Sequence, residues 1–506
     1  MAILSSIANW INYKRLVEID LFKTHPIEAQ HEVLFNLISK AEQTVFGQEH
    51  RFNQIKTKED FQKNIPIRSY EEFSPYIDRL LKGEKNILWP GKIKWFAKSS
   101  GTTNDKSKYI PVSKESLEDV HYRGFKDVMA IYFKNNPNSR IILGKGLTLG
   151  GSHQINSFNT ESFYGDLSAI LIENAPFGSD LIRVPKAKVA LINEFEKKVE
   201  MIIQSTKNEN ITSISGVPSW NLILLQRFLE ATGKTSISEL WPNLEVFFHG
   251  GIKFDPYRSQ FENIIASKNM HYMETYNASE GFFAIQDEFD KDDMLLMLDS
   301  GIYYEFIDMT DFYKENPRVL AIEDVELNRN YAIVISTNGG LWRYLIGDTV
   351  KFTQRFPFKI KITGRTKHFI NAFGEELIID NAEEALKVAC ERTNAKIKEF
   401  TAGPIFMSEN TKGAHQWIIE FEQEPDDLQH FISLLDNSLK TLNSDYEAKR
   451  HRNITLNEPE VMVARNGLFY DWMKLRGKVG GQNKIPRLSN DRTYLNELLE
   501  LSQRVN

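Results

Sequence analysis

The sequence lacks most of the features that mark secreted, membrane-spanning or nucleic-acid-binding proteins. Its 506 residues include one cysteine, Cys390, which excludes an intrachain disulfide framework and fits a reducing compartment. No run approaches the roughly 20 consecutive apolar residues of a membrane-spanning helix. The net charge of −6 gives no basic footprint for nucleic acid or for an anionic membrane surface.

The rest of the composition indicates a cytoplasmic globular protein of more than one domain. The sequence is 41% hydrophobic and 26% charged, which allows an ample core. Residues 1–12 are largely apolar, but no basic region precedes them, and Lys14 and Arg15 follow. This order predicts an amphipathic helix and not a signal peptide. We expect a monomer that binds neither nucleic acid nor membrane.

Small, hydroxylated and basic residues gather in one stretch, 99–111, which reads Ser-Ser-Gly-Thr-Thr-Asn-Asp-Lys-Ser-Lys-Tyr-Ile-Pro. A glycine lets the backbone approach a bound group closely. Hydroxyls and backbone N–H groups can surround phosphate oxygens, and a lysine adds a point charge. The stretch fits a phosphate cradle between two strands, and taken alone it fits a polar hairpin turn equally well.

The same stretch resembles the P-loop of nucleotide triphosphatases only superficially. The distance from Gly101 to Lys106-Ser107 is one residue short of that motif, and Asp105 replaces its second glycine. The motif also requires a helix directly afterwards, which Pro111 would break. We therefore exclude a P-loop enzyme.

The order of predicted elements indicates an α/β protein. Residues 1–90 are predicted to be largely helical. Strands and helices then alternate to about residue 250, and residues 295–352 are rich in predicted strands. The predicted strands of the alternating part are 140–144, 211–216 and 244–251, and its helices are 116–134, 220–232 and one within 182–206. This alternation predicts parallel strands with ligands at their carboxyl ends.

Two further stretches carry side chains suited to a nucleotide. A strand within the stretch 270–283 would deliver Tyr276, Ser279 and Glu280 to its carboxyl end, where a ring can stack on a base and a carboxylate can hold Mg²⁺. Asp348 follows an apolar run in a turn, where a fixed carboxylate could grip ribose hydroxyls. Each residue also has an ordinary interpretation: a packed tyrosine, a solvated glutamate, and a turn aspartate bonded to backbone.

Taken together and in order, these stretches resemble the adenylate-forming ligases. The closer resemblance is to the auxin-responsive Gretchen Hagen family of acyl acid amido synthetases, as a bacterial-like member. It covers nearly the whole chain and is supported by family-like C-terminal segments. The matching segments are 99–111, 276–280, 342–348, Gly364-Arg365, 413–420, 442–446, 463–469 and 482–487.

The resemblance implies a two-domain fold and a two-step reaction. Residues 1–364 would form a large N-terminal domain that binds ATP and the acid, with mixed and parallel sheets flanked by helices and a β-rich subdomain. Residues 365–506 would form a small, mobile α+β lid, hinged near Gly364-Arg365. A small carboxylic acid would attack ATP to give an acyl-adenylate, and an amino acid amine would then form the amide.

Matching positions imply a role for each site residue. The phosphate cradle would consist of Ser99, Ser100, Gly101, Thr102, Thr103 and Lys108. The rest of the nucleotide site would consist of Gly250, Gly251 and Tyr276 beside the adenine, Ser279 at the α-phosphate, Asp348 at the ribose hydroxyls and Arg365 close by. Glu280 would ligate Mg²⁺, and Lys484 would come from the lid to neutralise charge, so that Glu280, Lys108 and Lys484 form the catalytic set.

Two departures from the family pattern leave alternatives open. Asp105 replaces the usual glycine of the cradle, and Glu376 stands where plant members carry a lysine. The acceptor could therefore be a thiol, which would make the protein an acyl-CoA ligase, or the chain could bind nucleotide without catalysis. Candidate residues for the acid pocket are Tyr122, Phe125, Phe158, Phe163 and Tyr164, although such residues are more often core. The sequence names neither the acid nor the amine.

Overall fold

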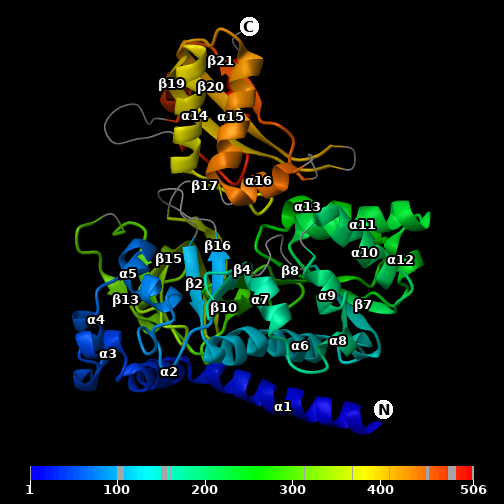
Figure 1. Ribbon diagram of the computed structural model, residues 1–506, viewed down its shortest axis with the longest axis vertical. Helices are drawn as coiled ribbons and strands as arrows, with labels where there is room; N and C mark the ends of the chain where they lie inside the picture. The colour runs from blue at the N-terminus through cyan, green and yellow to red at the C-terminus, as the bar shows by residue number, and fades with distance from the viewer. Residues whose placement is uncertain are drawn as a thin grey trace.

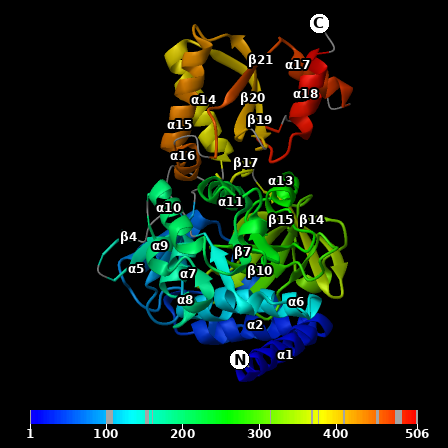
Figure 2. The same cartoon turned by 90° about the vertical axis from the view of Figure 1, so that its right-hand side faces the viewer.

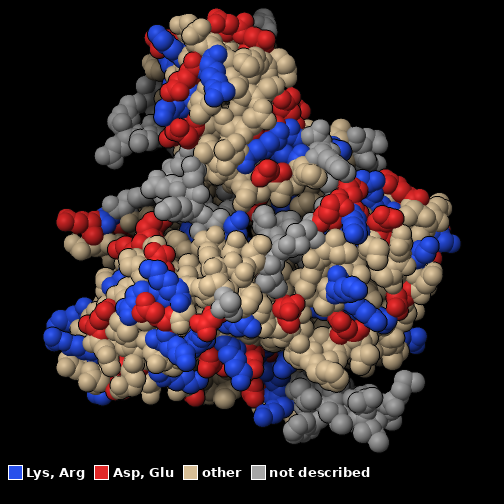
Figure 3. Space-filling view, viewed as in Figure 1, with Lys and Arg blue, Asp and Glu red and all other residues tan. Residues whose placement is uncertain are grey.

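A computed structural model gives the fold of the chain (Figure 1, Figure 2). It describes residues 2–99, 108–149, 156–159, 161–192, 194–312, 314–366, 369–375, 377–408, 411–451, 455–476 and 486–503. Both views show a large lower part that contains the N-terminus and a smaller upper lobe formed by the C-terminal elements. On the face in Figure 3, coloured basic and acidic side chains are interspersed over both parts.

The N-terminal part is helical, as predicted. Capping boxes at Thr57 and Ser69 fix the starts of two of these helices, because each side chain satisfies a backbone N–H that the first turn leaves unpaired. No helix in the described ranges is long and apolar enough to cross a membrane. The elements are α1 (Ala2–Thr24), α2 (Pro26–Ala41), α3 (Val45–Glu49), η1 (Phe52–Gln54), α4 (Lys58–Asn64) and α5 (Tyr70–Leu81).

A mixed sheet of twelve strands organises the large part of the molecule. Its strands from β9 to β6 run parallel, and those from β13 to β9 run antiparallel. In spatial order they are β13 (Val319–Leu320), β12 (Ile302–Asp308), β14 (Asn330–Thr337), β15 (Tyr344–Arg355), β16 (Phe358–Arg365), β11 (Met294–Leu296), β10 (Gly281–Ile285), β9 (His271–Ala278), β8 (Val246–Gly250), β7 (Ile211–Gly216), β3 (Lys145–Thr148) and β6 (Arg183–Val184).

Helices connect the parallel strands, as the alternating pattern predicts. The predicted helix over 220–232 is present as α11 (Pro218–Thr232), and Gly233 ends it in the left-handed conformation that a helix C-terminus favours. The predicted helix over 116–134 begins with a π-helical turn, η2 (Ser116–Tyr122), and continues as α6. The helices are α6 (Arg123–Asn135), α7 (Leu167–Glu173), α8 (Ser179–Ile182), α9 (Ala187–Ala190), α10 (Phe195–Thr206), α11, α12 (Ile237–Leu240) and α13 (Asp255–Ile265).

The predicted strand over 140–144 is wrong. This segment forms a 3₁₀ turn, η3 (Ile141–Leu143), and the strand β3 begins only at Lys145. The error has a physical cause, because a short apolar run has no periodicity that would distinguish a strand from a helical turn. Ile142 and Leu143 are 51% and 61% exposed, whereas Leu147 is buried.

A second sheet of four strands carries the two ends of the polar stretch. Its order is β2 (Lys108–Val112), β1 (Trp95–Ser99), β5 (Phe163–Gly165) and β4 (Asn156–Ser157). Strands β1 and β2 are antiparallel, and their last pair joins Ser99 to Lys108. The predicted placement of the polar stretch between two strands is therefore confirmed.

The C-terminal lobe has a three-stranded sheet covered by helices. Strand β19 (Lys396–Ile405) pairs antiparallel with β20 (Ala414–Gln423), and β20 pairs parallel with β21 (Glu460–Ala464). Cys390 lies half-buried in a helix. The other elements are β17 (Phe369–Ile370), β18 (Leu377–Ile378), α14 (Ile379–Thr393), α15 (Leu428–Leu442), α16 (Ser444–Arg450), α17 (Leu468–Leu475) and α18 (Thr493–Gln503).

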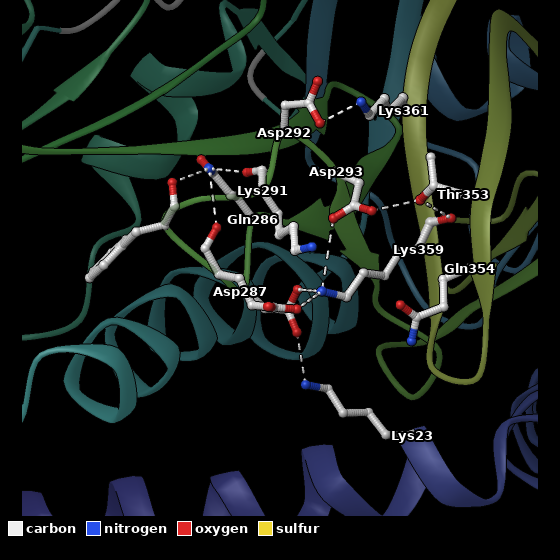
Figure 4. Close-up of polar contacts among 12 residues, drawn as sticks. Lys23, Gln286, Asp287, Lys291, Asp292, Asp293, Thr353, Gln354, Lys359 and Lys361 are labelled. Carbon is white, nitrogen blue, oxygen red and sulfur yellow. Dashed lines mark hydrogen bonds and ion pairs between the residues drawn. The ribbon is translucent and has the colours of Figure 1, made fainter.

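A buried lysine anchors the strand that leads to the C-terminal lobe (Figure 4). The Lys359 ammonium on β16 lies 2.8 Å from Asp287 Oδ1, and Lys23 of α1 lies 2.9 Å from Asp287 Oδ2. Thr353 on β15 donates to Asp293, whose other oxygen lies 3.8 Å from Lys359. Because removing one member of a buried ion pair leaves an uncompensated charge, these contacts fix β16 against α1 and the β10–β11 loop.

Candidate functional site

The carboxyl ends of three parallel strands meet at one edge of the large sheet. The register pairs Gly216 of β7 with His249 of β8, and Gly250 of β8 with Thr275 of β9. The two strand termini β8 and β9 therefore end side by side. This arrangement brings Gly250, the last residue of β8, and Gly251 after it to the same edge as Ser279 and Glu280, which follow β9.

The glycine pair is required by the backbone at this edge. A Cβ atom on Gly250 would collide with the carbonyl oxygen of Thr275 on the neighbouring strand. Gly251 has a φ of +83°, a conformation that side chains with a Cβ rarely adopt. Packing and backbone conformation thus explain why both positions are glycine. The absence of side chains also leaves room for a flat group to approach closely. The predicted place of the two glycines beside the adenine stays a prediction.

Asp348 is held by two donors from different strands. The register pairs Asp348 of β15 with Arg365 of β16, and Arg365 Nε donates to Asp348 Oδ1 at 2.8 Å. The Tyr276 hydroxyl donates to Asp348 Oδ2 at 2.6 Å. Three residues that the sequence assigned to one nucleotide site are therefore in direct contact.

This contact requires the large sheet to curl. Strands β9 and β15 are separated in the sheet by β10, β11 and β16. In a flat sheet, four spacings of about 4.8 Å would place them about 19 Å apart. The side chains of Tyr276 and Asp348 together are too short to span that distance, so the antiparallel half of the sheet bends until β9 approaches the start of β15.

Glu280 lies at the turn between β9 and β10, half-buried, beside a tyrosine that the sequence did not assign. The Tyr344 hydroxyl lies 3.5 Å from Glu280 Oε1. Burial, followed by the charge of Glu280, raises the pKa of Tyr344 well above its usual value, so its hydroxyl stays protonated and donates. Tyr344 was visible in the Trp-Arg-Tyr motif at 342–344, but only the structure gives its position.

The oxygen-rich character of this turn suits Mg²⁺. The described residues contain no group of three or more side chains able to hold a metal by themselves. Mg²⁺ bound together with a nucleotide needs only one or two carboxylates, because phosphate oxygens and water complete its shell. The donors here, the Glu280 carboxylate and the Ser279 hydroxyl, fit that requirement.

The described part of the predicted phosphate cradle lies beside α5. The Lys108 ammonium lies 5.8 Å from the centre of the Tyr70 ring, and the Tyr70 hydroxyl accepts the Tyr109 N–H at 2.7 Å. Backbone bonds join residue 68, just ahead of Tyr70, to residues 343 and 345, which flank Tyr344. The segment that carries Tyr70 is thus bonded to the segment that carries Tyr344, and Tyr70 is a second residue that the sequence did not assign.

Several predicted residues lie outside the described residues. They are Ser100, Gly101, Thr102 and Thr103 of the cradle, the departures Asp105 and Glu376, and Lys484. Their predicted roles stay predictions. Ser99 is described, as the last residue of β1.

Arg365 contacts both Asp348 and the C-terminal lobe. Its guanidinium carbon lies 4.9 Å from the centre of the Phe369 ring in β17. Farther along, the Tyr257 hydroxyl of α13 donates to the Ala372 carbonyl at 2.7 Å, and Lys449 of α16 lies 4.2 Å from the Trp220 ring of α11. Figures 1 and 2 show the C-terminal lobe resting on α11 and α13.

Burial at this interface lowers the pKa of Lys449 to about 8, and nearby carboxylates, Asp445 first, oppose the shift. A buried cation facing an aromatic ring across two lobes is a contact that a change in lobe orientation would break. The interface is therefore polar as well as apolar, in the manner of surfaces between moving domains.

The predicted acid-pocket aromatics divide into separate groups. Tyr164 and Phe158 pack with Tyr109 at centre distances of 5.3 and 4.8 Å, beside the cradle strands. Phe125 contacts Phe282 at 5.8 Å. Tyr122 donates to the Leu171 carbonyl at 2.8 Å, and Phe163 packs on Trp95 at 5.3 Å. Their predicted role in the pocket stays a prediction.

Comparison with known proteins gives relatives over nearly the whole chain. A 4-substituted benzoates-glutamate ligase, GH3.12 of Arabidopsis thaliana, is 24% identical over 85% of this chain and 87% of its own length. A jasmonoyl–L-amino acid synthetase, JAR6 of Nicotiana attenuata, is 21% identical over 90% of each chain. These relatives are plant proteins, and the predicted bacterial-like character stays a prediction.

Solved structures share the fold. The AtGH3.15 acyl acid amido synthetase in complex with 2,4-DB has a TM-score of 0.62 at 18% identity, over 96% of this chain and 95% of that chain. A 2-hydroxyisobutyryl-CoA ligase in its thioesterification state has a TM-score of 0.56 at 13% identity, over 94% and 92%. The predicted α/β fold of an adenylate-forming ligase with a smaller C-terminal domain is confirmed.

Family models divide the chain in the same way. The GH3 family N-terminal domain matches residues 15–270, just over half of the chain, and the central and C-terminal domains match 295–365 and 380–493. The central model ends at Arg365, where β16 ends and the chain passes into the C-terminal lobe. The chain therefore belongs to the GH3 family, the Gretchen Hagen family that its motifs resemble.

Proposed function

We propose that this protein is an ATP-dependent ligase that adenylates a small carboxylic acid and transfers the acyl group to an amino acid amine. The observation that carries the proposal is the contact of Tyr276, Asp348 and Arg365, with Glu280 near enough for its charge to act on the Tyr276 hydroxyl. The relatives named acid-amido synthetases confirm the predicted class of enzyme, an acid–amino acid ligase.

The chemistry explains why a nucleotide is needed. A carboxylate is a poor acyl donor, because its leaving group would be oxide. Attack of its oxygen on the α-phosphorus of ATP forms the acyl-adenylate and releases pyrophosphate. The amine then attacks the acyl carbon, and AMP leaves as a stable anion. Positive groups placed where charge develops lower both barriers.

The residues divide this work between binding and charge stabilisation. Asp348 accepts hydrogen bonds from the ribose hydroxyls, while Arg365 and Tyr276 hold its carboxylate in place. Lys108 and Lys484 place positive charge at the phosphates, and Ser279 donates to the α-phosphate. Glu280 would hold Mg²⁺, which would supply Lewis-acid stabilisation of the phosphate oxygens.

Movement of the C-terminal lobe would separate the two steps. We assign residues 1–364 to the ATP- and acid-binding domain and residues 365–506 to a mobile lid. The lid would turn about Gly364-Arg365, where Gly364 has a φ of +148° that favours glycine. Rotation would break contacts such as Lys449 on Trp220 and would keep water from the acyl-adenylate.

The test is a screen of carboxylic acids against amino acids and CoA. Enzyme, ATP, Mg²⁺ and one acid are combined, pyrophosphate is measured, and the product mass is read after an amino acid or CoA is added. We expect pyrophosphate with a subset of acids, and an amide with an amino acid. A thioester without amide would identify an acyl-CoA ligase, and ATP binding with no turnover for any acid would indicate a homologue without catalysis.

A further inference from the structure

The Tyr276 ring is buried in the sheet, and its hydroxyl makes a hydrogen bond. The side chain is 5% exposed and packs on Phe283 at a centre distance of 4.8 Å. Its hydroxyl donates to Asp348 Oδ2 at 2.6 Å, which is a short bond between a neutral donor and a carboxylate. The sequence assigns this tyrosine only to the base, yet the contact that the structure gives it is with the residue assigned to the ribose.

Asp348 is fixed at both oxygens. Arg365 donates to Oδ1 at 2.8 Å and Tyr276 donates to Oδ2 at 2.6 Å. A carboxylate with one donor can turn about its final torsion, whereas donors on both oxygens set the plane of the group. Each oxygen can accept more than one hydrogen bond, so acceptor capacity remains for two ribose hydroxyls.

The two donors differ in how they are anchored. Arg365 is the last residue of β16, and its guanidinium also stacks on Phe369 of the C-terminal lobe. Tyr276 lies within β9, inside the large sheet. Burial, followed by the charge of Asp348, raises the pKa of Tyr276 well above its usual value, so the hydroxyl keeps its proton and remains a donor.

We propose that Tyr276 is a positioning residue for the nucleotide ribose: its hydroxyl sets the orientation in which Asp348 accepts the ribose hydroxyls. This role is separate from stacking on the adenine, which needs only the ring. The inference rests on the proposed function, because it requires that Asp348 binds the ribose. It adds that the preference for a ribonucleotide depends on Tyr276, which does not touch the ribose.

The test compares nucleotides that differ only in the ribose. Calorimetry measures the Kd of the wild-type protein and of Tyr276→Phe for ATP, 2′-deoxy-ATP and 3′-deoxy-ATP. The variant keeps the ring and removes the hydroxyl. We expect the wild type to prefer ATP about tenfold or more, as expected for a lost hydrogen bond to a charged group. In Tyr276→Phe, we expect ATP affinity to fall about tenfold and the preference to shrink severalfold.

A second buried tyrosine provides a matched control. Tyr304 on β12 is 1% exposed, also contacts Phe283, and its hydroxyl has no hydrogen-bond partner among the described residues. Tyr304→Phe should leave all three affinities unchanged. It also shows whether loss of any buried hydroxyl beside Phe283 alters the site through packing alone.

The outcomes separate this inference from the proposed function. If Tyr276→Phe binds all three nucleotides more weakly by the same factor, or binds them as the wild type does, the positioning role is wrong. Because binding needs no acid, this result can be read even if no acid supports turnover. A wild-type protein that binds ATP selectively but releases no pyrophosphate with any acid would contradict the proposed function and leave the ribose test valid.

Discussion

Glu280→Gln is expected to lower Mg²⁺-dependent pyrophosphate release by about 100-fold or more, because the change removes the carboxylate charge that we assign to the metal. Metal stabilisation of phosphate charge contributes several kcal/mol to such transition states, and each 1.36 kcal/mol is about tenfold in rate. Glutamine keeps the shape of the side chain beside Tyr344. The rate is measured with a pyrophosphate-coupled assay over a range of Mg²⁺ concentrations.

The control for this prediction is a carboxylate beyond the other end of β10. Asp290 is exposed in the turn after β10, and Asp290→Asn should leave the rate unchanged. The Glu280 assignment also predicts that the apparent Mg²⁺ requirement rises in Glu280→Gln. Wild-type rates and an unchanged Mg²⁺ dependence in that variant would contradict the assignment.

Arg343→Met is expected to destabilise the protein by about 3–5 kcal/mol, because it leaves a buried carboxylate without its positively charged partner. Arg343 donates to both oxygens of Glu305, at 2.8 and 3.0 Å, and to the carbonyls of Gln62 and Ile65. Arg343 is 4% exposed and Glu305 is 1% exposed. The measurement is the shift of the urea unfolding midpoint followed by tryptophan fluorescence.

An exposed ion pair supplies the matched comparison. Arg79 lies 2.8 Å from Glu84 with both side chains about 40% exposed, and Arg79→Met should cost at most about 1 kcal/mol. In the double variant Arg343→Met with Glu305→Leu, part of the lost stability should return, since no buried charge remains. If Arg343→Met were as stable as Arg79→Met, the buried pair would not stabilise this region.

Arg343, which stabilises the fold, also lies next to Tyr344 of the candidate site. It precedes Tyr344, whose hydroxyl faces Glu280, and it has a φ of +46°, which is unusual for a residue with a side chain. Its bonds to Glu305 and to the segment ahead of α5 hold that conformation. The turn that presents Tyr344 is therefore set by the contacts of Arg343 with Glu305, Gln62 and Ile65, none of which belongs to the predicted nucleotide site.

The sequence predicted the elements whose periodicity and boundaries are clear. The strand β7 and the helix α11 lie where apolar patterning and Gly233 place them. The strand at 140–144 was wrong, because three apolar residues fit a turn and a strand equally well. The position of the strand is decided by the pairing of β3 with β6 and β7. The residues of β6 and β7 lie far along the chain, so the local sequence does not show this pairing.

For the candidate site, too, the sequence predicts local features but not long-range contacts. Short motifs and their order predicted a shared site for Tyr276, Glu280, Asp348 and Arg365, because each motif is local, and their role in that site stays a prediction. The bond from Tyr276 to Asp348 joins residues 72 positions apart, and it depends on the curvature of a sheet that no local pattern encodes. Tyr70 was visible in the sequence only as the first residue of a helix, and its contacts with Tyr109 and Lys108 come from the packing of α5 on β2.

The central claim, adenylation followed by transfer to an amine, is tested most directly by isotope transfer. An acid that supports turnover is labelled with oxygen-18 in its carboxylate and is converted to the amide with ATP and an amino acid, and the AMP is analysed by mass. Attack on the α-phosphorus makes a labelled oxygen the bridge, and aminolysis leaves that oxygen on the phosphate. We predict AMP that carries one labelled oxygen and unlabelled pyrophosphate; unlabelled AMP, or ADP with labelled phosphate, would contradict the account.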